Sequence, residues 1–238
     1  MKSSILTLFV AVFFLAIGCD SDEVTPKGTE CDPSNAPVFA ESDGLLLIEF
    51  EQADFGDGWQ LVQDLSNATG DGYMRWGGDD HFGNPGNGVA TFQLNISTPG
   101  TYRFTWRSAV TEGDNPTEAN DTWLRFADAD DFYGEKGNGS LVYPNGTGKS
   151  PTPEGASKDG WFKVYRSGNP LDFKWQARTS DNDAHNIFVT FETAGTYTME
   201  VSGRSHGHAV DKFVMFLPDT YSFDEATQST AFSTFTCK

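Results

Sequence analysis

The sequence predicts an all-β protein, a β-sandwich of the jelly-roll type with one long loop insertion. Short segments of alternating polar and apolar residues recur along the chain and are separated by turn sequences, as in the strands of a sandwich. The composition agrees with this, because 20 Phe and 25 Gly among 238 residues suit strands joined by turns better than they suit helix bundles.

The net charge of the chain limits the classes of partner that it is expected to bind. Lys and Arg total 16 against 34 Asp and Glu, which gives a formal net charge of −18. Such a chain repels phosphate backbones, so nucleic acid is not an expected partner. The hydrophobic content of 37% is enough for one core, and the sequence therefore predicts a folded domain rather than a disordered chain.

Residues 1–18 are predicted to be a signal peptide. Lys2 is followed by an apolar stretch, Ile5 to Ile17, which is too short to span a membrane. The stretch ends in Leu-Ala-Ile-Gly directly before Cys19 and resembles the bacterial lipoprotein signal. The resemblance implies that Cys19 carries a lipid and that this lipid is the membrane anchor. Ordinary secretory cleavage nearby, with Cys19 incidental, is the alternative.

An acidic run at residues 20–23 follows this cysteine. It is similar to the surface-export signal of Bacteroidota lipoproteins, which implies an outer-membrane protein that faces outside the cell. Residues 19–42 contain prolines and little periodicity, so we expect a tether there. The folded domain is expected to occupy residues 43–238.

The two remaining cysteines, Cys31 and Cys237, lie at the two ends of this domain. An oxidising cell envelope permits them to pair. The bond would close a loop of about 200 residues, which the chain-entropy model values at roughly 5 kcal/mol. Two free thiols are the alternative.

The body of the chain reads as short strands. Residues 89–96 show the pattern clearly, because Ala, Phe, Leu and Ile at even positions alternate with Thr, Gln and Asn. The same alternation continues in 102–107, where three aromatic residues share one face. The other expected strands cover residues 45–50, 72–76, 122–126, 161–166, 173–178, 187–191, 196–201 and 209–216.

A turn sequence occurs twice. Thr-Pro-Gly-Thr-Tyr at 98–102 and Thr-Ala-Gly-Thr-Tyr at 193–197 each join two alternating segments. We expect two similar hairpins, and two such hairpins indicate two facing sheets. Residues 127–160 are rich in Gly and Pro and are expected to form the long loop insertion, a kind of segment that is usually functional or mobile.

Several of these segments resemble carbohydrate-binding modules of families 6 and 35. The resemblance covers about residues 45–217, apart from the insertion, which compact modules lack. It implies a galactose-binding-like jelly roll that binds a glycan without cleaving it and often holds a structural calcium ion. The matching segments are Leu-Ile-Glu-Phe-Glu-Gln-Ala at 47–53, Gly-Tyr-Met at 72–74, Pro-Gly-Thr-Tyr at 99–102 and Gly-His-Ala-Val-Asp-Lys-Phe at 207–213.

A calcium site is part of this expectation. Glu49 and Glu51 alternate with an aromatic residue, which directs both carboxylates to one side of a strand. The resemblance adds Asp211, on the last strand. Calcium takes six to eight oxygen ligands, so these three acids would supply only part of the shell. Alternatively, the two glutamates form a solvated face or pair with Lys212.

Sugar binding needs flat apolar faces and forked hydrogen-bonding groups. Two tryptophans stand at strand ends beside polar loops, and three arginines would suit uronic or sulfated sugars if they converge. Tryptophans buried in the core and arginines paired with surface acids are the alternatives. The expected carbohydrate-binding residues are Trp76, Asp80, His81, Arg107, Trp175, Arg178, Arg204, His206 and His208.

The function expected from these features is non-catalytic glycan binding by a monomer, in polysaccharide capture at the cell surface. A lyase or hydrolase that acts on an acidic polysaccharide is the first alternative, because Arg, His, Tyr and many acids occur in the loops. A structural or adhesive surface lipoprotein without a glycan ligand is the second.

Overall fold

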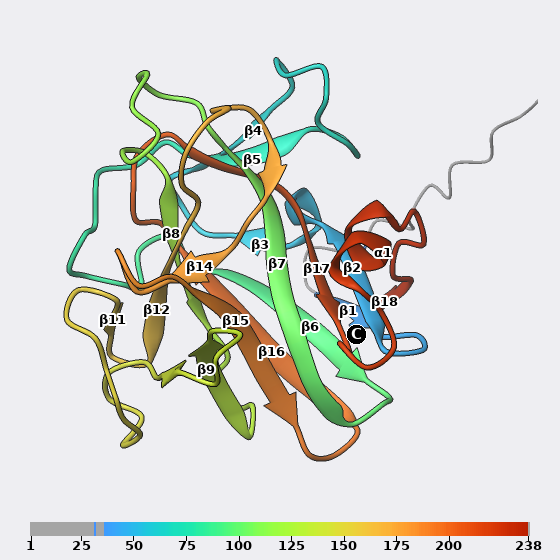
Figure 1. Cartoon of the computed structure of the whole chain (residues 1–238). Helices are drawn as coiled ribbons and strands as arrows, with labels where there is room; N and C mark the ends of the chain where they lie inside the picture. Colours follow the sequence, from blue (N-terminus) through green and yellow to red (C-terminus); the bar gives the residue numbers. More distant parts are fainter. Residues whose placement is uncertain (1–30, 32–35, 238) are drawn as a thin grey trace, which may run out of the picture.

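The computed structural model describes Cys31 and residues 36–237 of the chain (Figure 1). Nearly all of its regular structure is β, and the strands form two sheets that face each other, which confirms the predicted fold class. The first sheet has the order β18 (Phe235–Cys237), β1 (Pro37–Ala40), β6 (Ala90–Ile96), β16 (Gly195–Ser202), β8 (Asp121–Arg125), β12 (Trp161–Tyr165) and β11 (Ser157–Lys158), with β3 (Asp54–Phe55) also paired to β6.

The second sheet is built around the longest strand of the fold. Its order is β2 (Leu45–Glu49), β17 (His208–Phe216), β7 (Gly100–Val110), β15 (His185–Phe191), β9 (Asp131–Glu135) and β10 (Leu141–Val142). Short strands extend it: β5 (Tyr73–Trp76) pairs with β17 and β4 (Trp59–Val62), β13 (Lys174–Trp175) pairs with β7, and β14 (Arg178–Thr179) joins β15 to β12 of the first sheet.

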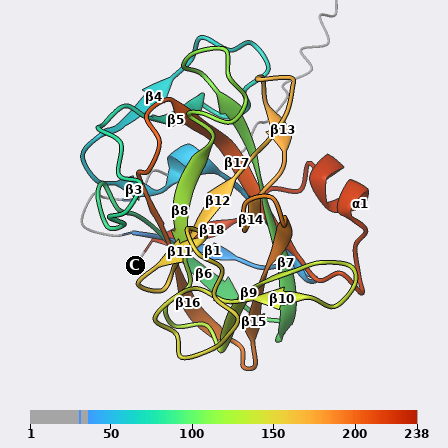
Figure 2. The ribbon, with the colours of Figure 1, turned by 60° about the vertical axis from the view of Figure 1, so that its left-hand side comes forward.

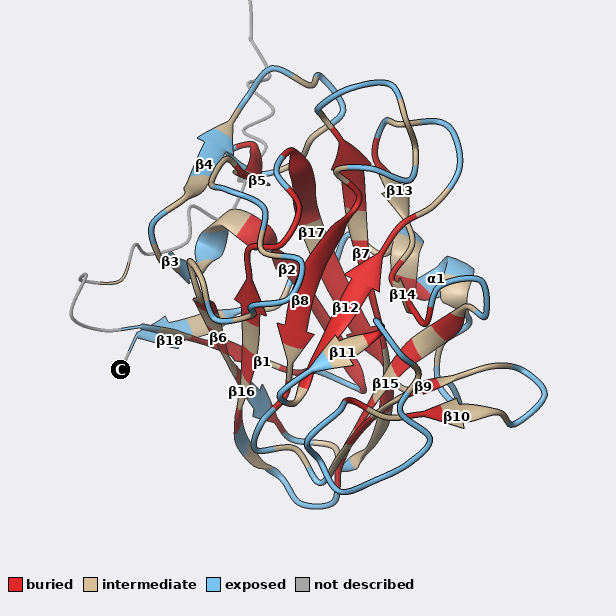
Figure 3. Cartoon of the chain, turned by 90° about the vertical axis from the view of Figure 1, so that its left-hand side faces the viewer, coloured by how far each residue is buried: buried red, intermediate tan, exposed pale blue. Residues whose placement is uncertain are grey.

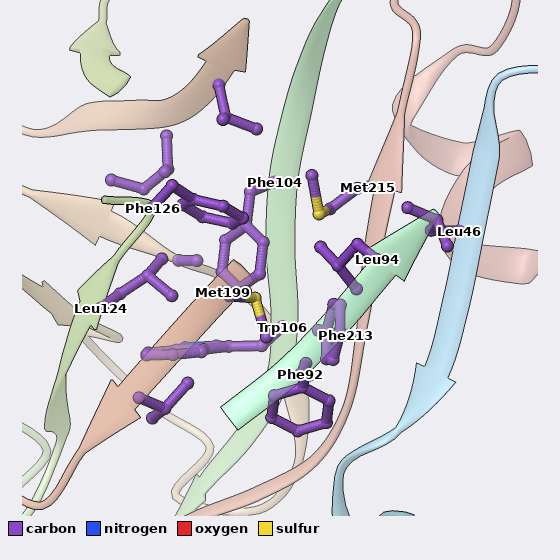
Figure 4. Packing of buried hydrophobic residues seen from close by; sticks show 14 of the residues in the cluster. Leu46, Phe92, Leu94, Phe104, Trp106, Leu124, Phe126, Met199, Phe213 and Met215 are labelled. Carbon is purple, nitrogen blue, oxygen red and sulfur yellow. The ribbon is translucent and has the colours of Figure 1, made fainter. Parts of the chain in front are cut away.

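The core fills the space between the sheets. Phe92 and Leu94 enter it from β6, Phe104 and Trp106 from β7, and Phe213 from β17 (Figure 4). All five are at most 1% exposed. Figure 3 shows buried residues concentrated in the strands and exposed residues in the connections. Burial alternates along β6, β9 and β15, so every second side chain of these strands remains outside the core, whereas β2 and β12 are buried at every position.

The two predicted hairpins are wrong, although the two facing sheets are confirmed. β6 pairs with β16 and β7 pairs with β15, so each turn carries the chain from one sheet to the other. A tyrosine holds each turn: the Tyr102 hydroxyl donates to the Thr98 carbonyl at 2.7 Å, and the Tyr197 hydroxyl donates to the Thr193 carbonyl at 2.8 Å. The repeated sequence encodes a tyrosine corner, a hydrogen-bonded link at the edge of a sandwich.

The insertion at 127–160 is not a structureless loop. It contains β9, β10 and β11, and β9 pairs with β15 along its whole length. β9 was not predicted, because the glycine within it interrupts the alternation of polar and apolar residues. Gly134 lies where a Cβ atom would come within 3.0 Å of three side-chain atoms, so the glycine allows β9 to pack closely.

Regular structure also continues beyond the predicted last strand. The helix α1 (Phe223–Gln228) begins with a capping box, in which Ser222 and Glu225 bond each other's backbone N–H groups. Figures 1 and 2 show α1 outside the two sheets. It covers an apolar patch on the outer side of β2 and β17, where Ala226 is fully buried.

The two ends of the domain are joined as predicted. Cys31 and Cys237 form a disulfide across 206 residues, and β18 pairs with β1 beside it. Residues 37–40, expected in the tether, form β1 and belong to the domain. The predicted signal peptide and Cys19 lie outside the described residues. Within the part that is described, no helix is long and apolar enough to cross a membrane.

Candidate functional site

Three neighbouring strands of the second sheet carry polar and aromatic side chains on their outer side. The register places Arg103 of β7 beside Phe188 of β15, and Phe188 beside Tyr133 of β9. Residues in register on adjacent strands share a face of the sheet, so these three side chains form one row across it. We call the outward-facing residues of β7, β15 and β9 the outer face.

The row is an aromatic strip with a charged end. The rings of Tyr133 and Phe188 stack at 5.7 Å with an interplanar angle of 15°, and Tyr143 lies 6.1 Å beyond Tyr133. The rings of Tyr133, Tyr143 and Phe188 belong to residues that are partly exposed. Arg103 closes the strip at its other end.

Polar rows flank the strip on both sides. On one side, Asn186 of β15 lies between Glu135 of β9 and Arg178 of β14. On the other side, the Thr101 and Thr190 hydroxyls are 2.8 Å apart. Aromatic rings edged by amide, hydroxyl and charged groups provide both kinds of contact that a sugar uses.

A cavity of about 180 Å³ lies at the charged end of the strip. Arg103 and Arg178 both line it, together with Trp175 from β13 and Phe223 from α1. The Arg103 guanidinium lies over the Phe223 ring, with its carbon 4.6 Å from the ring centroid. The remaining lining residues are Thr105, Gln176, Ala177 and Asn186.

The charge of Arg178 acts on Arg103. Burial lowers the pKa of Arg103, and the positive charge of Arg178 lowers it further. The Nε atom of Arg103 is buried and has no hydrogen-bond partner among the described residues. Within residues 36–237, neither arginine forms an ion pair with a carboxylate, although seven other Lys and Arg side chains do.

Only some of the predicted sugar-binding residues lie at this cavity. Trp175 and Arg178 meet at this cavity. Arg103, Tyr133 and Phe188 were missed, because in the sequence they look like the polar half of one strand and ordinary strand aromatics. Alternation in 102–107 was the signal that could have placed Arg103 outside, since its neighbours on both sides enter the core.

Trp76 does not act as a sugar platform. It is 2% exposed, and its indole is packed among Gly58, Gly78, Gly88 and Gly203, where any added Cβ would come within 2.6 Å of the ring. The indole N–H donates to the Asp79 carbonyl at 2.9 Å. Trp76 is thus a core residue that the glycine-rich loops enclose.

Of the two arrangements that the sequence left open for Arg107, Arg178 and Arg204, the structure does not show convergence. Arg107 pairs with Asp211 at 2.6 Å, and Arg204 pairs with Asp121. Neither of these two arginines lines the cavity that contains Arg178. Both form an ion pair with an aspartate, as the alternative interpretation of paired arginines expected.

The predicted histidines separate in the same way. His208 is fully buried, and burial lowers its pKa to about 3, so it is neutral and bonds Thr122. His206 is exposed at the loop edge, where its backbone N–H donates to Asp80 and its Nδ1 lies 2.9 Å from the Gly78 carbonyl. His81 stays beside these loops, with its ring 5.8 Å from Trp76.

The three predicted metal ligands come close together, but in a different way from the prediction. The strand ends at Glu49, and Glu51 belongs to the short 3₁₀ helix η1 (Phe50–Gln52). The carboxylates of Glu49 and Asp211 both accept hydrogen bonds from Thr69, and Glu51 accepts from the Asp71 N–H at 2.8 Å. The loop 69–71 thus gathers all three acids.

Two cations already face this acid cluster, which we define as Glu49, Glu51 and Asp211. Arg107 pairs with Asp211, and Lys212 lies in register with Glu49. As they stand, no three Asp, Glu, His or Cys side chains in the described part of the chain are arranged to hold a metal ion. Glu51 Oε2 is nevertheless buried without a hydrogen-bond partner there, and an orphan carboxylate oxygen is a feature that a cation would satisfy.

No protein-family model matches the chain, and no curated protein matches it. The chain is similar to a family 35 carbohydrate binding module from Clostridium thermocellum, with 15% identity over 72% of this chain and 97% of that one, and a TM-score of 0.40. It is also similar to the module CBM6cm-2 of Cellvibrio mixtus lichenase 5A in complex with cellotriose, with 11% identity, 73% and 98% coverage, and a TM-score of 0.41.

A third similar structure is a larger chain. It is the GH26-CBM35 β-(1,4)-mannanase of Podospora anserina, with 18% identity over 74% of this chain and a TM-score of 0.41. Our chain spans 28% of the mannanase, and 24% of the isomalto-dextranase of Arthrobacter globiformis T6 that it also matches.

The burial of Trp76 leads to a stability prediction. Trp76→Ala should lower the free energy of unfolding by about 3–5 kcal/mol, because it empties a site that four glycines surround. Trp175→Ala should cost less, because Trp175 is partly exposed. Urea denaturation of the two variants measures the difference, and equal losses would contradict the burial of Trp76.

The acid cluster leads to a pH prediction. Burial raises the pKa values of Glu49 and Glu51 to about 7 from 4.5, so between these pH values the folded state binds more protons than the unfolded state. This contribution to stability is complete below pH 4.5 and is lost as the pH rises through about 7.

Glu51→Gln imitates the protonated side chain. It should therefore raise the melting temperature at pH 8 by several degrees and change it little at pH 4.5. Comparing each variant with the wild type at the same pH cancels the opposing titration of the buried histidines. Glu192→Gln, at an exposed position, is the matched control, and the same shift at both pH values for Glu51→Gln would refute the raised pKa.

Proposed function

We propose that this protein binds a glycan on its outer face, without cleaving it, in polysaccharide capture at a bacterial cell surface. The observation that carries the proposal is the registered row of Arg103, Phe188 and Tyr133 across three strands. Two stacked rings offer a flat apolar surface to the C–H faces of a sugar, and the flanking rows offer amide and hydroxyl groups to its oxygens.

The length of the strip supports a chain rather than a single sugar. Neighbouring strands lie about 4.8 Å apart, so a row over three strands, extended by Tyr143, spans several sugar units. Trp175 and Phe223 form a wall at the cavity end. A polysaccharide segment laid across the strands would therefore contact the aromatic residues in succession.

The carboxylates on the outer face favour binding over hydrolysis. Asp131 and Glu135 are four residues apart on β9, so their backbones are about 13 Å apart. Glycosidases hold their two carboxyl groups about 5–9.5 Å apart across the scissile bond. A lyase would combine arginine and tyrosine with a base such as histidine, but none of the register positions on the outer face within the described residues is a histidine.

The cell-surface part of the proposal rests on the sequence alone. Cleavage before Cys19, its lipidation and outward display on the outer membrane would place the outer face among extracellular polysaccharides. The acidic run after Cys19 and the tether would give the domain reach from the membrane.

Native affinity electrophoresis tests the glycan proposal. The wild type should be retarded in gels that contain one or more of xylan, mannan, laminarin, alginate and polygalacturonate, with no new reducing ends or unsaturated products. Tyr133→Ala should weaken the retardation about tenfold or more, because loss of a stacking anchor costs more than loss of a rim contact.

Phe82→Ala is the matched control. Phe82 is 57% exposed at the loop edge, where Arg204 stacks on it, and it lies away from the strip. Binding that is lost in Phe82→Ala and kept in Tyr133→Ala would move the site to the loop edge. No retardation in any gel would refute glycan binding from this panel, and turnover of a bound polymer would replace binding with catalysis.

We also propose that Ca²⁺ binds the acid cluster and stabilises the fold. The support is the orphan Glu51 oxygen and the burial of the two glutamates, which raises their pKa values even though Lys212 and Arg107 lie nearby. A divalent cation would stabilise the ionised forms, with Glu49, Glu51 and Asp211 as ligands.

Calcium should therefore raise the melting temperature most at pH 8, where the glutamates ionise. At about 100 times its dissociation constant it would add roughly 2.7 kcal/mol, and a chelator should reverse the gain. Glu51→Gln should lose most of the gain, whereas Glu192→Gln should keep it. A wild-type melting temperature that neither calcium nor chelator changes would exclude the site.

A further inference from the structure

The cavity at the end of the aromatic strip contains two arginines that no carboxylate neutralises within residues 36–237. We propose that this cavity is an anion subsite, which receives a carboxylate or sulfate group of an acidic sugar while the rest of the glycan lies on the strip. The inference rests on the proposed function, because it names the class of sugar bound by that same surface.

The geometry of Arg103 suits this role. Its guanidinium lies over the Phe223 ring at 4.6 Å, so the ring covers one face of the group. Stacking leaves the N–H donors at the edge of the plane available, and these donors bind carboxylate and sulfate oxygens in pairs. The described residues provide no partner for the Nε–H, which is buried.

Arg178 places a second guanidinium group beside that of Arg103. It lies in register with Asn186, and Asn186 shares the outer face with Arg103 through β15. Both arginines line the same cavity, so one anion can reach both. Two adjacent cations repel each other until an anion binds between them, and this repulsion favours an anionic ligand over a neutral one.

The charges around the cavity do not already satisfy this pair. Glu135 is the nearest carboxylate in the rows, and it lies on β9, with β15 between it and Arg178. Asp131 pairs with Lys149 at the far side of the strip, and Asp181 pairs with Lys163. The site is therefore locally positive within a chain whose net charge is −18.

The cavity has a volume of about 180 Å³. This volume is large enough for the carboxylate or sulfate substituent of a sugar. Trp175 and Phe223 bound the cavity, and α1 supplies one of these two walls. The acidic sugar would therefore be held at one end of the bound segment, and its neighbours would extend over Phe188 and Tyr133.

Isothermal titration with matched probes tests the subsite. Trigalacturonate carries carboxylates, its methyl ester has the same backbone without charge, and a sulfated carrageenan tetrasaccharide carries sulfate. The wild type should bind at least one anionic probe about tenfold or more tightly than the methyl ester. Which anionic probe binds decides between a carboxylate and a sulfate ligand.

Variants then assign the preference to the two arginines. R103Q and R178Q should each weaken binding of the anionic probe about tenfold and leave binding of the ester unchanged. R178K should weaken it less than R178Q, because lysine keeps the charge but lacks the fork. R125Q is the matched control, since Arg125 pairs with Glu200 on the first sheet. Circular dichroism and melting temperatures verify folding, and if R103Q does not fold, R178Q and the wild-type preference still decide.

The outcomes separate the two proposals. Equal wild-type affinity for anionic and neutral probes, equal losses for both in the glutamine variants, or no binding of either anionic probe would overturn the anion subsite. If neutral polysaccharides still bind and that binding depends on Tyr133, the proposed glycan function stands. If no polysaccharide binds at all, both proposals fall.

Discussion

The period-two alternation of β7 is the constraint on which the rest of the structure depends. Tyr102, Phe104 and Trp106 all enter the core, so Arg103 and Arg107 must stand on the outer side. β7 pairs with β17 on one edge and with β15 on the other, and its register is therefore imposed on both neighbours. A slip of one residue would bury both arginines and expose three aromatic residues, which makes the register strongly specified.

Arg103 and Arg107 stand four residues apart on β7, in two opposite electrostatic environments. Beside Arg107, β17 shifts its register between Val210 and Lys212, and this irregularity leaves Asp211 unpaired in the ladder and available to the arginine. Beside Arg103, β15 is regular and offers only Phe188. The same strand thus provides a neutralised cation at the acid cluster and an uncompensated one at the aromatic strip.

The sequence predicted features that depend on a single segment better than features that depend on which distant segments pack together. Alternation in 89–96 and 102–107 predicted the strands and their buried faces correctly, because it is a property of each segment. The hairpins were wrong because the repeated turn does not say which distant strand will pair with each segment. Trp76 and Trp175 looked alike in the sequence, and only the approach of Gly88 and Gly203 from remote segments makes one of them core.

The arginine pair was missed for the same reason, because Arg103 and Arg178 meet only through the pairing of β15 with β7 and β14. Seven of the thirteen Lys and Arg side chains in residues 36–237 form ion pairs with carboxylates, Arg107 and Arg204 among them. Arg103 and Arg178 lie close together without a carboxylate partner, and this arrangement lowers the stability of the fold through desolvation and charge repulsion. A bound anion would remove the repulsion between the two arginines and so offset this cost. An acidic ligand would gain this free energy on binding and a neutral ligand would not, so the protein would prefer acidic ligands. This local positive charge would also oppose the general repulsion that a chain of charge −18 exerts on an acidic polysaccharide.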